Sequence, residues 1–410
     1  MGLAALAALQ AGRTALAVLA ALLTIGLSPL AFVFLCLVLA AFLVVRRPAG
    51  RRVAAVGAGL AAAAGLELAV LLLFPAGGRY EFRTRELAFA LLAAVIGAAV
   101  AAQSRRGRPL AAFFLLFGLA CIVAYFIPSP LGSNITRLRI FVLPLVLLGA
   151  ALSAFRPRWL ALPAVLAAGF YSLSPFSVVA TQLDDTAAKA SYWAPALAFL
   201  QEHGSPEYRV DVVPTFDNWE AWYLPRAGEA LARGWYRQLD LARNPQLYRQ
   251  RLEPADYRRW LRSLGVRFVL LPDVELDRLG AEAQATLLRS GRSGLREVLR
   301  GGGWRVFELP AATPILTGPA AAGLTVLGHD RIAGTVAGAG DYRLRVRYTR
   351  YFEVRSGPVC LARATDGMTL LRAAGAGPFE LRIASGRNLL AALAGSPQGA
   401  CPASSSAQNR

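Results

Sequence analysis

The feature that most constrains this chain is a change of composition near residue 180. Before this point, long apolar runs alternate with short arginine-rich loops, and after it the composition is that of a soluble protein. A helix needs roughly 20 apolar residues to cross the hydrocarbon core of a bilayer, and about 17 suffice at the short end. We therefore predict a multi-pass α-helical membrane domain of about seven spans over residues 1–180. The predicted runs are Leu3–Ile25, Leu30–Val45, Val53–Phe74, Leu87–Ala102, Leu110–Ile127, Ile140–Phe155 and Trp159–Val179.

The arginines of the membrane domain lie in alternate loops, which indicates the orientation of the spans. Lysine and arginine favour the cytoplasmic side because they resist translocation. The intervening loops contain more proline and glycine, although Arg79, Arg83 and Arg85 weaken the contrast. We predict a bacterial plasma-membrane protein whose N-terminus is cytoplasmic and whose chain after residue 180 is extracytoplasmic. The predicted cytoplasmic loops contain Arg46, Arg47, Arg51, Arg52, Arg105, Arg106, Arg108, Arg156 and Arg158.

Arg13 lies inside the first apolar run and needs an explanation. A charge at membrane depth is expensive and marks a functional site by default. Either the spanning helix begins after Arg13, or Arg13 faces a polar interior of the bundle. We expect the later start.

The net charge of +19 belongs mostly to the membrane domain, because residues 1–180 contribute +12 and the rest of the chain +7. No basic run has the interleaved aromatic residues by which proteins hold single-stranded nucleic acid. We therefore predict membrane lipids, and no nucleic acid, as partners. Mild positive charge on the outer domain would suit anionic headgroups or phosphates, but a solvated arginine-rich surface explains it more simply.

The four cysteines and two histidines predict little metal or redox chemistry. Cys360 and Cys401 are both predicted outside the cell and would be able to pair there, but sequence alone does not fix that pairing. No spacing resembles a zinc site. We identify no cofactor, and the adjacent Asp184 and Asp185 leave a divalent metal open.

After residue 180 we expect three parts. Residues 181–312 alternate helical and strand patterns, which predicts an extracytoplasmic α/β domain with a small, largely parallel sheet; one of its predicted helices is Glu229–Leu241. Residues 313–392 contain short strand patterns between glycine and proline turns, which predicts a small β-sandwich-like module. Residues 393–410 are rich in Ser, Ala and Gln, which predicts a disordered tail.

The first candidate site is the loop 128–137 between two predicted spans, which contains Asn134 and Arg137. An arginine at the mouth of a helix can bind a phosphate with two hydrogen bonds. The alternative is a turn followed by arginines that reach toward the membrane surface, and we favour that alternative by about two to one.

The second candidate site is the segment 216–223, in which Asp217, Trp219 and Glu220 lie close together. Aromatic rings stack on the apolar face of sugars, and carboxylates bind hydroxyl groups or act as acid and base. An amphipathic segment that packs its aromatic residues on the sheet would have the same pattern.

The third candidate site is the segment 232–240, in which Arg233, Trp235 and Arg237 offer hydrogen-bond donors and an aromatic plane. An Arg237–Asp240 pair at helical spacing would instead have a structural role. There is no nucleophile elbow and no Ser-His-Asp set. Any catalysis would depend on carboxylates, and the catalytic residue is unknown.

Four stretches resemble a known group of proteins: residues 27–35 (Leu27-Ser-Pro-Leu-Ala-Phe-Val-Phe-Leu35), 130–137 (Pro130-Leu-Gly-Ser-Asn-Ile-Thr-Arg137), 218–221 (Asn218-Trp-Glu-Ala221) and 232–240. The group consists of large actinobacterial-type multi-pass proteins that look like GT-C class glycosyltransferases, and the likeness covers most of residues 14–310. The resemblance implies a transferase that takes sugar from a polyprenyl-phosphate donor at the outer face and passes it to a cell-envelope glycan.

The resemblance also implies a missing part. GT-C enzymes place their catalytic acid in the first outer loop, whereas the first outer turn here, Leu27-Ser28-Pro29, has no acidic residue. The chain is therefore expected to correspond to the C-terminal part of a longer enzyme, or to a non-catalytic relative. The alternative function is a non-enzymatic envelope membrane protein whose outer domain binds a glycan or a protein.

Overall fold

The computed structural model describes residues 1–46, 50–74, 78–153, 158–181 and 184–401, without the side chains of residues 52, 152–153, 158–161, 174–175 and 177–181. Arg47 and Arg156 of the predicted loops, and residues 402–410 of the predicted tail, lie outside the described residues. The chain divides into two compact units. The first comprises Met1–Asp184 and Arg237–Ala242, and the second comprises Asp185–Tyr236 and Arg243–Arg410.

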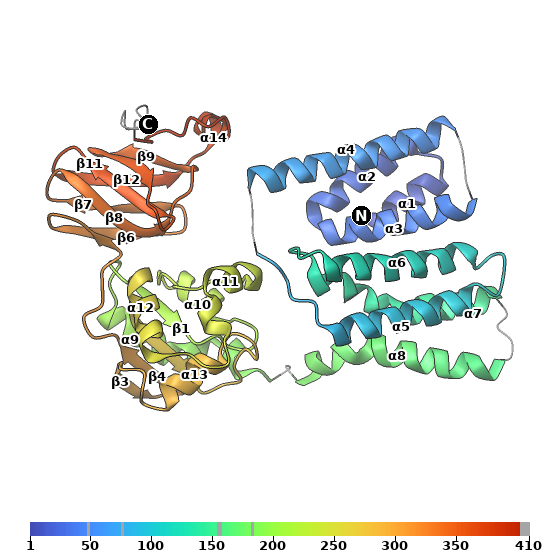
Figure 1. Cartoon of the computed structure of the whole chain (residues 1–410), viewed down its shortest axis with the longest axis horizontal. Coiled ribbons are helices and arrows are strands. Elements are labelled where there is room, and N and C mark those ends of the chain that lie inside the picture. Colours follow the sequence, from blue (N-terminus) through green and yellow to red (C-terminus); the bar gives the residue numbers. More distant parts are fainter. Residues whose placement is uncertain (47–49, 75–77, 154–157, 182–183, 402–410) are drawn as a thin grey trace, which may run out of the picture. The chain divides into compact units, whose positions relative to one another are not determined.

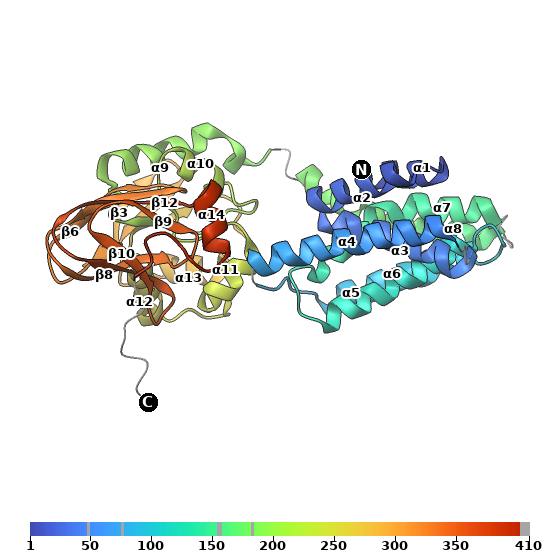
Figure 2. The ribbon, with the colours of Figure 1, turned by 90° about the horizontal axis from the view of Figure 1, so that it is seen from above.

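The first unit is a bundle of apolar helices that run side by side (Figures 1 and 2). Among the described residues, five helices are long and apolar enough to cross a membrane, and two shorter apolar helices accompany them. This confirms a series of apolar membrane-length helices, whereas the number of seven spans stays a prediction. The elements are α1 (Gly2–Gln10), α2 (Thr14–Leu27), α3 (Pro29–Arg46), α4 (Arg51–Leu73), α5 (Thr84–Ala101), α6 (Arg108–Phe126), η1 (Gly132–Phe141), α7 (Val142–Ser153) and α8 (Arg158–Thr181).

The first apolar run forms two helices, α1 and α2. The chain breaks between α1 and α2 at Gly12, which has a φ of +73° that a side chain would disfavour. Arg13 donates its backbone N–H to the carbonyl of Ala8 at 2.8 Å and is exposed in the turn. Because α2 begins at Thr14, the prediction that a helix starts after Arg13 is confirmed.

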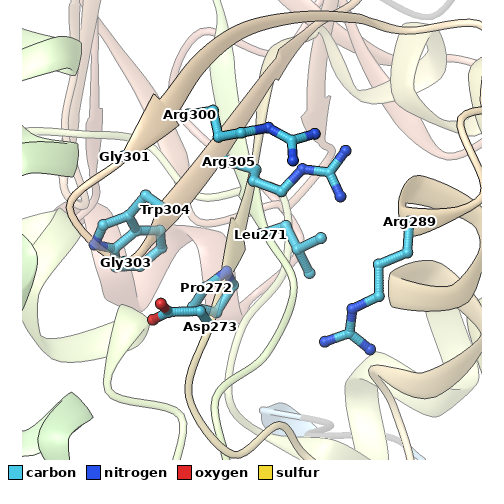
Figure 3. Close-up of a pocket in the computed structure, with 9 residues that line it drawn as sticks. All are labelled: Leu271, Pro272, Asp273, Arg289, Arg300, Gly301, Gly303, Trp304 and Arg305. Carbon is cyan, nitrogen blue, oxygen red and sulfur yellow. The ribbon is translucent and has the colours of Figure 1, made fainter.

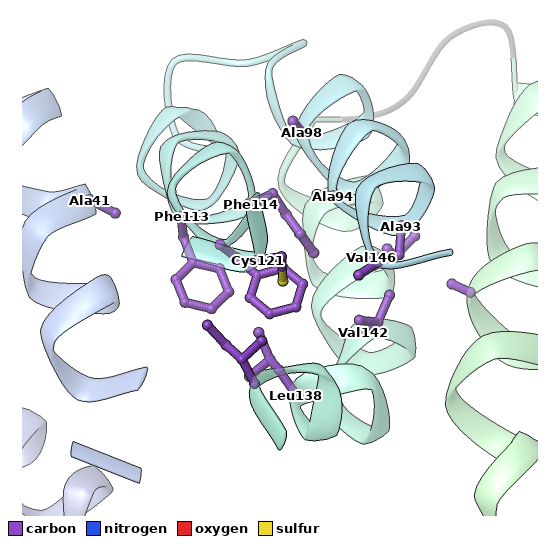
Figure 4. Packing of buried hydrophobic residues seen from close by; sticks show 14 of the residues in the cluster. Ala41, Ala93, Ala94, Ala98, Phe113, Phe114, Cys121, Leu138, Val142 and Val146 are labelled. Atoms are coloured by element: carbon purple, nitrogen blue, oxygen red, sulfur yellow. The ribbon is translucent and has the colours of Figure 1, made fainter. Parts of the chain in front are cut away.

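Small residues allow α5 and α6 to approach closely (Figure 4). Ala90, Ala94 and Ala98 recur every four residues on α5 and are buried against α6. Phe114 of α6 fills the space above Gly97, where a Cβ atom would lie 2.5 Å from the ring. Interfaces of this kind are typical of helices in lipid, where close packing drives association in place of the hydrophobic effect.

Large apolar side chains cover the outside of the bundle. Leu66 and Leu72 of α4 are 60% and 71% exposed, and Phe170 of α8 is 77% exposed. Surfaces this apolar are rare on soluble proteins and mark contact with another apolar phase. The outside of the helices therefore fits a lipid environment.

The second unit begins with an α/β layer, which consists of a four-stranded sheet with helices on both of its faces. The strand order is β1-β2-β4-β3, in which only β1 and β2 are parallel. The predicted largely parallel sheet was therefore wrong, because the chain returns after β2 and α13 as a hairpin through Gly301-Gly302-Gly303. The elements are η2 (Thr186–Ala188), α9 (Ala190–His203), β1 (Arg209–Val212), α10 (Glu220–Arg226), η3 (Pro245–Tyr248), α12 (Pro254–Leu264), β2 (Val266–Pro272), α13 (Glu282–Arg289), β3 (Arg296–Gly301) and β4 (Trp304–Glu308). Between α10 and η3 the chain also forms α11 (Arg237–Arg243), of which Arg237–Ala242 belong to the first unit.

The predicted helix Glu229–Leu241 was wrong over its first half. Residues 229–236 are not helical, because this segment pairs with β1. Val210 donates its N–H to the carbonyl of Ala230 at 2.9 Å and accepts from the N–H of Ala232 at 2.8 Å. Sheet pairing therefore satisfies backbone groups that a helix would have satisfied locally.

The rest of the second unit is a sandwich of two antiparallel sheets, β10-β11-β8-β5 and β6-β7-β12-β9. Tyr342 and Leu344 from one sheet and Phe379 and Leu381 from the other form a shared core. Residues 340–347 form a half-buried strand, in which Tyr342 and Leu344 are buried and their neighbours are more exposed. The elements are β5 (Leu316–Thr317), β6 (Ala322–Leu327), β7 (Arg331–Val336), β8 (Gly340–Arg347), β9 (Phe352–Ser356), β10 (Val359–Arg363), β11 (Met368–Ala373), β12 (Gly377–Ile383) and α14 (Gly386–Leu393).

The described part of the predicted tail is tied to this sandwich. Cys360 of β10 and Cys401 form a disulfide bond. Next to it, the N–H of Cys401 donates to the carbonyl of Leu361 at 2.9 Å. Residues 393–401 are therefore ordered by a bond that the sequence left open.

Candidate functional site

The carboxyl ends of β1 and β2 form one edge of the α/β sheet, and both strands continue there into polar segments. Phe216 donates its N–H to the carbonyl of Glu275 at 3.0 Å, and Asp277 donates its N–H to the carbonyl of Pro214 at 2.9 Å. These bonds hold the two segments together. Open α/β sheets place ligands outside the carboxyl ends of their strands, so this edge is the candidate site of the second unit.

Glu220 is the central titratable group at this edge. Its carboxylate accepts hydrogen bonds from the N–H of Thr215 at 3.1 Å and from the Thr215 hydroxyl at 2.8 Å. Burial raises the pKa of Glu220 to about 7, against the opposing effects of these hydrogen bonds and of the Arg233 charge. A carboxyl group that titrates near neutral pH can act as an acid or a base.

Arg233 is held by a buried polar network. Its Nη1 donates to the carbonyl of Gly280 at 3.1 Å and to Oε1 of Gln284 at 3.2 Å. Gln284 in turn donates through Nε2 to the hydroxyl of Tyr257 at 2.8 Å and to the carboxylate of Asp211. The network fixes the position of Arg233, whose positive charge is near enough to lower the pKa of Glu220.

Trp219 has a packing role. Its Nε1 donates to the carboxylate of Asp185 at 2.7 Å. The neighbouring Tyr223 stacks on Trp193 of α9, with ring centroids 5.2 Å apart, and its hydroxyl donates to the carbonyl of Ala188. These aromatic rings therefore attach α10 to α9, as in the packing alternative for this segment.

Two other tryptophans of the second unit remain available to a ligand. Trp235 is 65% exposed. Trp222 of α10 is 52% exposed and has the guanidinium of Arg226 at 3.6 Å from its ring centroid. Only Trp235 was among the predicted residues. The helical spacing of Trp222 and Arg226 was the signal that sequence reasoning missed.

Asp217 lies exposed in the same segment as Glu220. Burial and the charges of Asp185 and Glu275 raise its pKa, so these three carboxylates are near one another. Even so, among the described residues no three His, Cys, Asp or Glu side chains are arranged to hold a metal ion. A divalent metal in this protein stays a prediction.

The remaining predicted residues belong to the first unit. Asn134 and Arg137 lie on η1, a 3-10 helix whose buried side consists of Ile135 and Leu138. Side chains at positions i and i+3 of a 3-10 helix eclipse one another, so Asn134 and Arg137 share a face. Arg237 is the first residue of α11, and residues 237–242 belong to the first unit. There, Nε2 of the neighbouring Gln238 donates to the carbonyl of Pro130 at 3.5 Å.

The predicted site residues therefore divide between the two units. Asn134, Arg137 and Arg237 belong to the helical bundle, and the others belong to the α/β layer. Within the α/β layer, Glu220 and Arg233 have separate hydrogen-bond partners and interact through their charges. The residues of the α/β layer are Asp217, Trp219, Glu220, Arg233 and Trp235.

Sequence reasoning missed a second set of charged residues. Arg289, Arg300 and Arg305 line a cavity of about 280 Å³ beside the β3–β4 hairpin. Arg300 and Arg305 flank the three glycines of that hairpin, which was a usable local signal. Arg289 is distant in sequence and carried no such signal.

No protein-family model, curated protein or solved structure matches this chain. The fold defines the chain as one with membrane-length apolar helices followed by a sheet-rich C-terminal unit. A functional proposal therefore has to depend on its own residues.

Proposed function

We propose that this chain is an integral membrane protein of the GT-C type, which acts on lipid-linked sugars at the outer face of the plasma membrane during cell-envelope glycan assembly. The membrane unit would hold the polyprenyl-phosphate donor, and the second unit would hold the glycan acceptor. The resemblance of residues 14–310 to GT-C proteins motivates the class of reaction. The disulfide between Cys360 and Cys401 supports an oxidising, extracytoplasmic location for the second unit.

The observation that supports this proposal most is the order of side chains along one face of η1. Asn134, Arg137 and Ile140 succeed one another at intervals of three residues and so share that face. Arg137 is exposed and has no acidic partner among the described side chains, and Ile140 is 43% exposed. An amide, a guanidinium and an apolar side chain in this order match the sugar, the phosphate and the polyprenyl chain of a lipid-linked sugar.

The second unit offers groups that suit an acceptor glycan. Glu220, with a pKa near 7, lies at a sheet edge of the kind that binds ligands. The exposed rings of Trp222 and Trp235 would stack on sugar rings. Asp217 would accept hydrogen bonds from sugar hydroxyls.

The first test is the replacement Arg137→Ala in the full chain, reconstituted in lipid nanodiscs. The wild-type protein should bind polyprenyl phosphate more tightly than the uncharged polyprenol. A charge-assisted hydrogen bond is worth about 1.5–3 kcal/mol, so Arg137→Ala should raise the Kd for polyprenyl phosphate by about 10- to 100-fold. Arg137→Lys should retain part of the affinity, because it keeps the charge but loses the planar fork.

Arg105→Ala is the matched control, because Arg105 is also exposed but lies in one of the predicted cytoplasmic loops. It should leave the Kd unchanged. Equal affinity of the wild type for polyprenyl phosphate and polyprenol would remove the proposed role of Arg137.

One observation favours the alternative function, a non-enzymatic envelope protein whose second unit binds a glycan or a protein. The turn between α2 and α3 is the single residue Ser28. The first outer turn, where GT-C enzymes place their catalytic acid, therefore has no acidic residue. Sugar transfer from a polyprenyl-phosphate donor by the reconstituted protein would exclude this alternative. Glycan binding without binding of polyprenyl phosphate would establish it instead.

A further inference from the structure

A cavity of about 280 Å³ opens at the carboxyl end of β2, between the β3–β4 hairpin and the last turn of α13 (Figure 3). Three different elements each contribute an arginine to it: Arg289 from α13, Arg300 from β3 and Arg305 from β4. Leu271 and Pro272 at the end of β2 form an apolar side of the cavity. The fold thus places three guanidinium groups around one small space.

Arg300 and Arg305 are direct cross-strand partners. Like charges in that position are destabilising, and Glu297 compensates only one of them. The Glu297 carboxylate accepts from Nε of Arg300 at 2.5 Å and from Nη2 of Arg305 at 2.6 Å. These hydrogen bonds lower the pKa of Glu297 to about 2, so its single negative charge faces two positive charges.

Arg289 adds a third positive charge that no described acidic group balances. It is exposed on α13, and among the described residues it has neither a hydrogen bond nor an ion pair from its side chain. Figure 3 shows that Arg289 reaches into the space toward which Arg300 and Arg305 also extend. Asp273, on the other side of this view, accepts a hydrogen bond from the hydroxyl of Tyr192 at 3.1 Å.

We propose that this cavity binds the phosphoryl group of a small soluble ligand. Three guanidinium groups against the carboxylates of Glu297 and Asp273 leave a net positive charge, and guanidinium forks bind phosphate oxygens in pairs. A phosphoryl group suits this space better than a single carboxylate, because its several acceptor oxygens can bind more than one guanidinium fork at once. The cavity is smaller than the pockets of roughly 300–1,000 Å³ that hold drug-sized molecules. This site is independent of the lipid site proposed at Arg137.

The test is calorimetric titration of the full chain, in nanodiscs of zwitterionic lipid, with inorganic pyrophosphate and separately with sodium acetate. Pyrophosphate should bind saturably, and acetate should not compete with it. Arg289→Ala should raise the Kd for pyrophosphate by about tenfold, and Arg305→Ala should do the same. Arg289→Ala is the decisive variant, because within the described part of the chain the Arg289 side chain has no hydrogen bond or ion pair to lose.

Arg292→Ala is the matched control, since Arg292 is an exposed arginine of the next loop that does not line the cavity. It should leave the Kd unchanged. The absence of saturable pyrophosphate binding to the wild type, or an equal Kd for wild type and Arg289→Ala, would overturn the proposal. A second series in nanodiscs with phosphatidic acid separates the ligand sources: an unchanged Kd supports a soluble ligand, and competition by the lipid would overturn that assignment.

Discussion

At the scale of single residues, the candidate site depends on the environment of Glu220. The Thr215 donors and the positive charge of Arg233 favour the ionised carboxylate, but burial outweighs them and raises its pKa to about 7. The folded protein therefore binds a proton at Glu220 that the unfolded chain releases at lower pH. Between the ordinary glutamate pKa of 4.5 and about 7, the folded state has more bound protons than the unfolded state, so stability falls as pH rises through this window.

Replacing Glu220 with the neutral Gln should abolish the loss of stability that rising pH causes through this carboxyl group. At pH 8 the Glu220→Gln variant should be more stable than the wild type, by about 1–3 kcal/mol from the size of the shift. At about pH 3 or below, where Glu220 is protonated in both the folded and the unfolded state, the two proteins should differ little. The measurement is thermal unfolding of the full chain in detergent, followed by tryptophan fluorescence at several pH values.

Glu202→Gln is the control for this experiment, because the Glu202 side chain is 79% exposed. It should change stability by less than about 0.5 kcal/mol at either pH. If Glu220→Gln and the wild type showed the same pH dependence, the carboxyl group would titrate normally and its proposed chemistry would be lost.

At the scale of secondary-structure elements, the helical hydrogen bonding is interrupted at the break between η1 and α7. Backbone groups at this break need hydrogen-bond partners from another element. Ser172 of α8 supplies it: its hydroxyl donates to the carbonyl of Arg139 at 2.6 Å and accepts from the N–H of Leu143 at 2.9 Å. In an apolar environment, backbone groups without such partners cost several kcal/mol. One side chain therefore stabilises the element that presents Asn134 and Arg137.

Ser172→Ala should destabilise the first unit by about 1–3 kcal/mol, because it leaves two backbone groups without that hydroxyl. The same replacement should weaken binding of polyprenyl phosphate if η1 shifts. Thermal unfolding in a fixed detergent measures the first effect. Ser133→Ala is the control, because it keeps the backbone carbonyl of Ser133 that accepts a hydrogen bond from the hydroxyl of Thr136. Equal stability of the two variants would show that the break needs no such support.

Local patterns predicted those elements that local interactions define. The helix Pro254–Leu264, ended by Gly265 with a φ of +72°, and the strand Val266–Pro272 agree with their sequence signals. The failures come from distant pairing. Residues 229–236 pair with β1 instead of continuing α11, and β4 is antiparallel to β2 because a glycine hairpin reverses the chain.

In the candidate site too, the sequence predicted features that depend on neighbouring residues and missed those that depend on distant ones. The proximity of Asp217, Trp219 and Glu220 was visible in the sequence because they are neighbours. The contact from Trp219 to Asp185 joins residues 34 positions apart, and the network from Arg233 to Gln284 spans 51. Only the fold brings such pairs together, so the sequence showed the residue types without their roles.

At the scale of the whole molecule, a membrane-length helical unit precedes a sheet-rich unit that a disulfide stabilises. The segments that join the apolar helices are alternately rich in arginine and in proline. The positive-inside tendency and the preference of disulfides for oxidising compartments both support the proposed orientation, in which the arginine-rich ends face the cytoplasm and the second unit lies outside. All functions proposed for the second unit depend on its exposure at the outer face.

The most direct test is therefore the side of the membrane on which the second unit lies. Single cysteines are introduced by Arg292→Cys in the second unit and by Arg105→Cys in the first, in a background without Cys36 and Cys121, and spheroplasts are treated with a membrane-impermeant maleimide. We predict that the Arg292→Cys protein reacts in intact spheroplasts, and that the Arg105→Cys protein reacts only after lysis. Reaction of the Arg105→Cys protein in intact spheroplasts, with protection of the Arg292→Cys protein, would contradict the account.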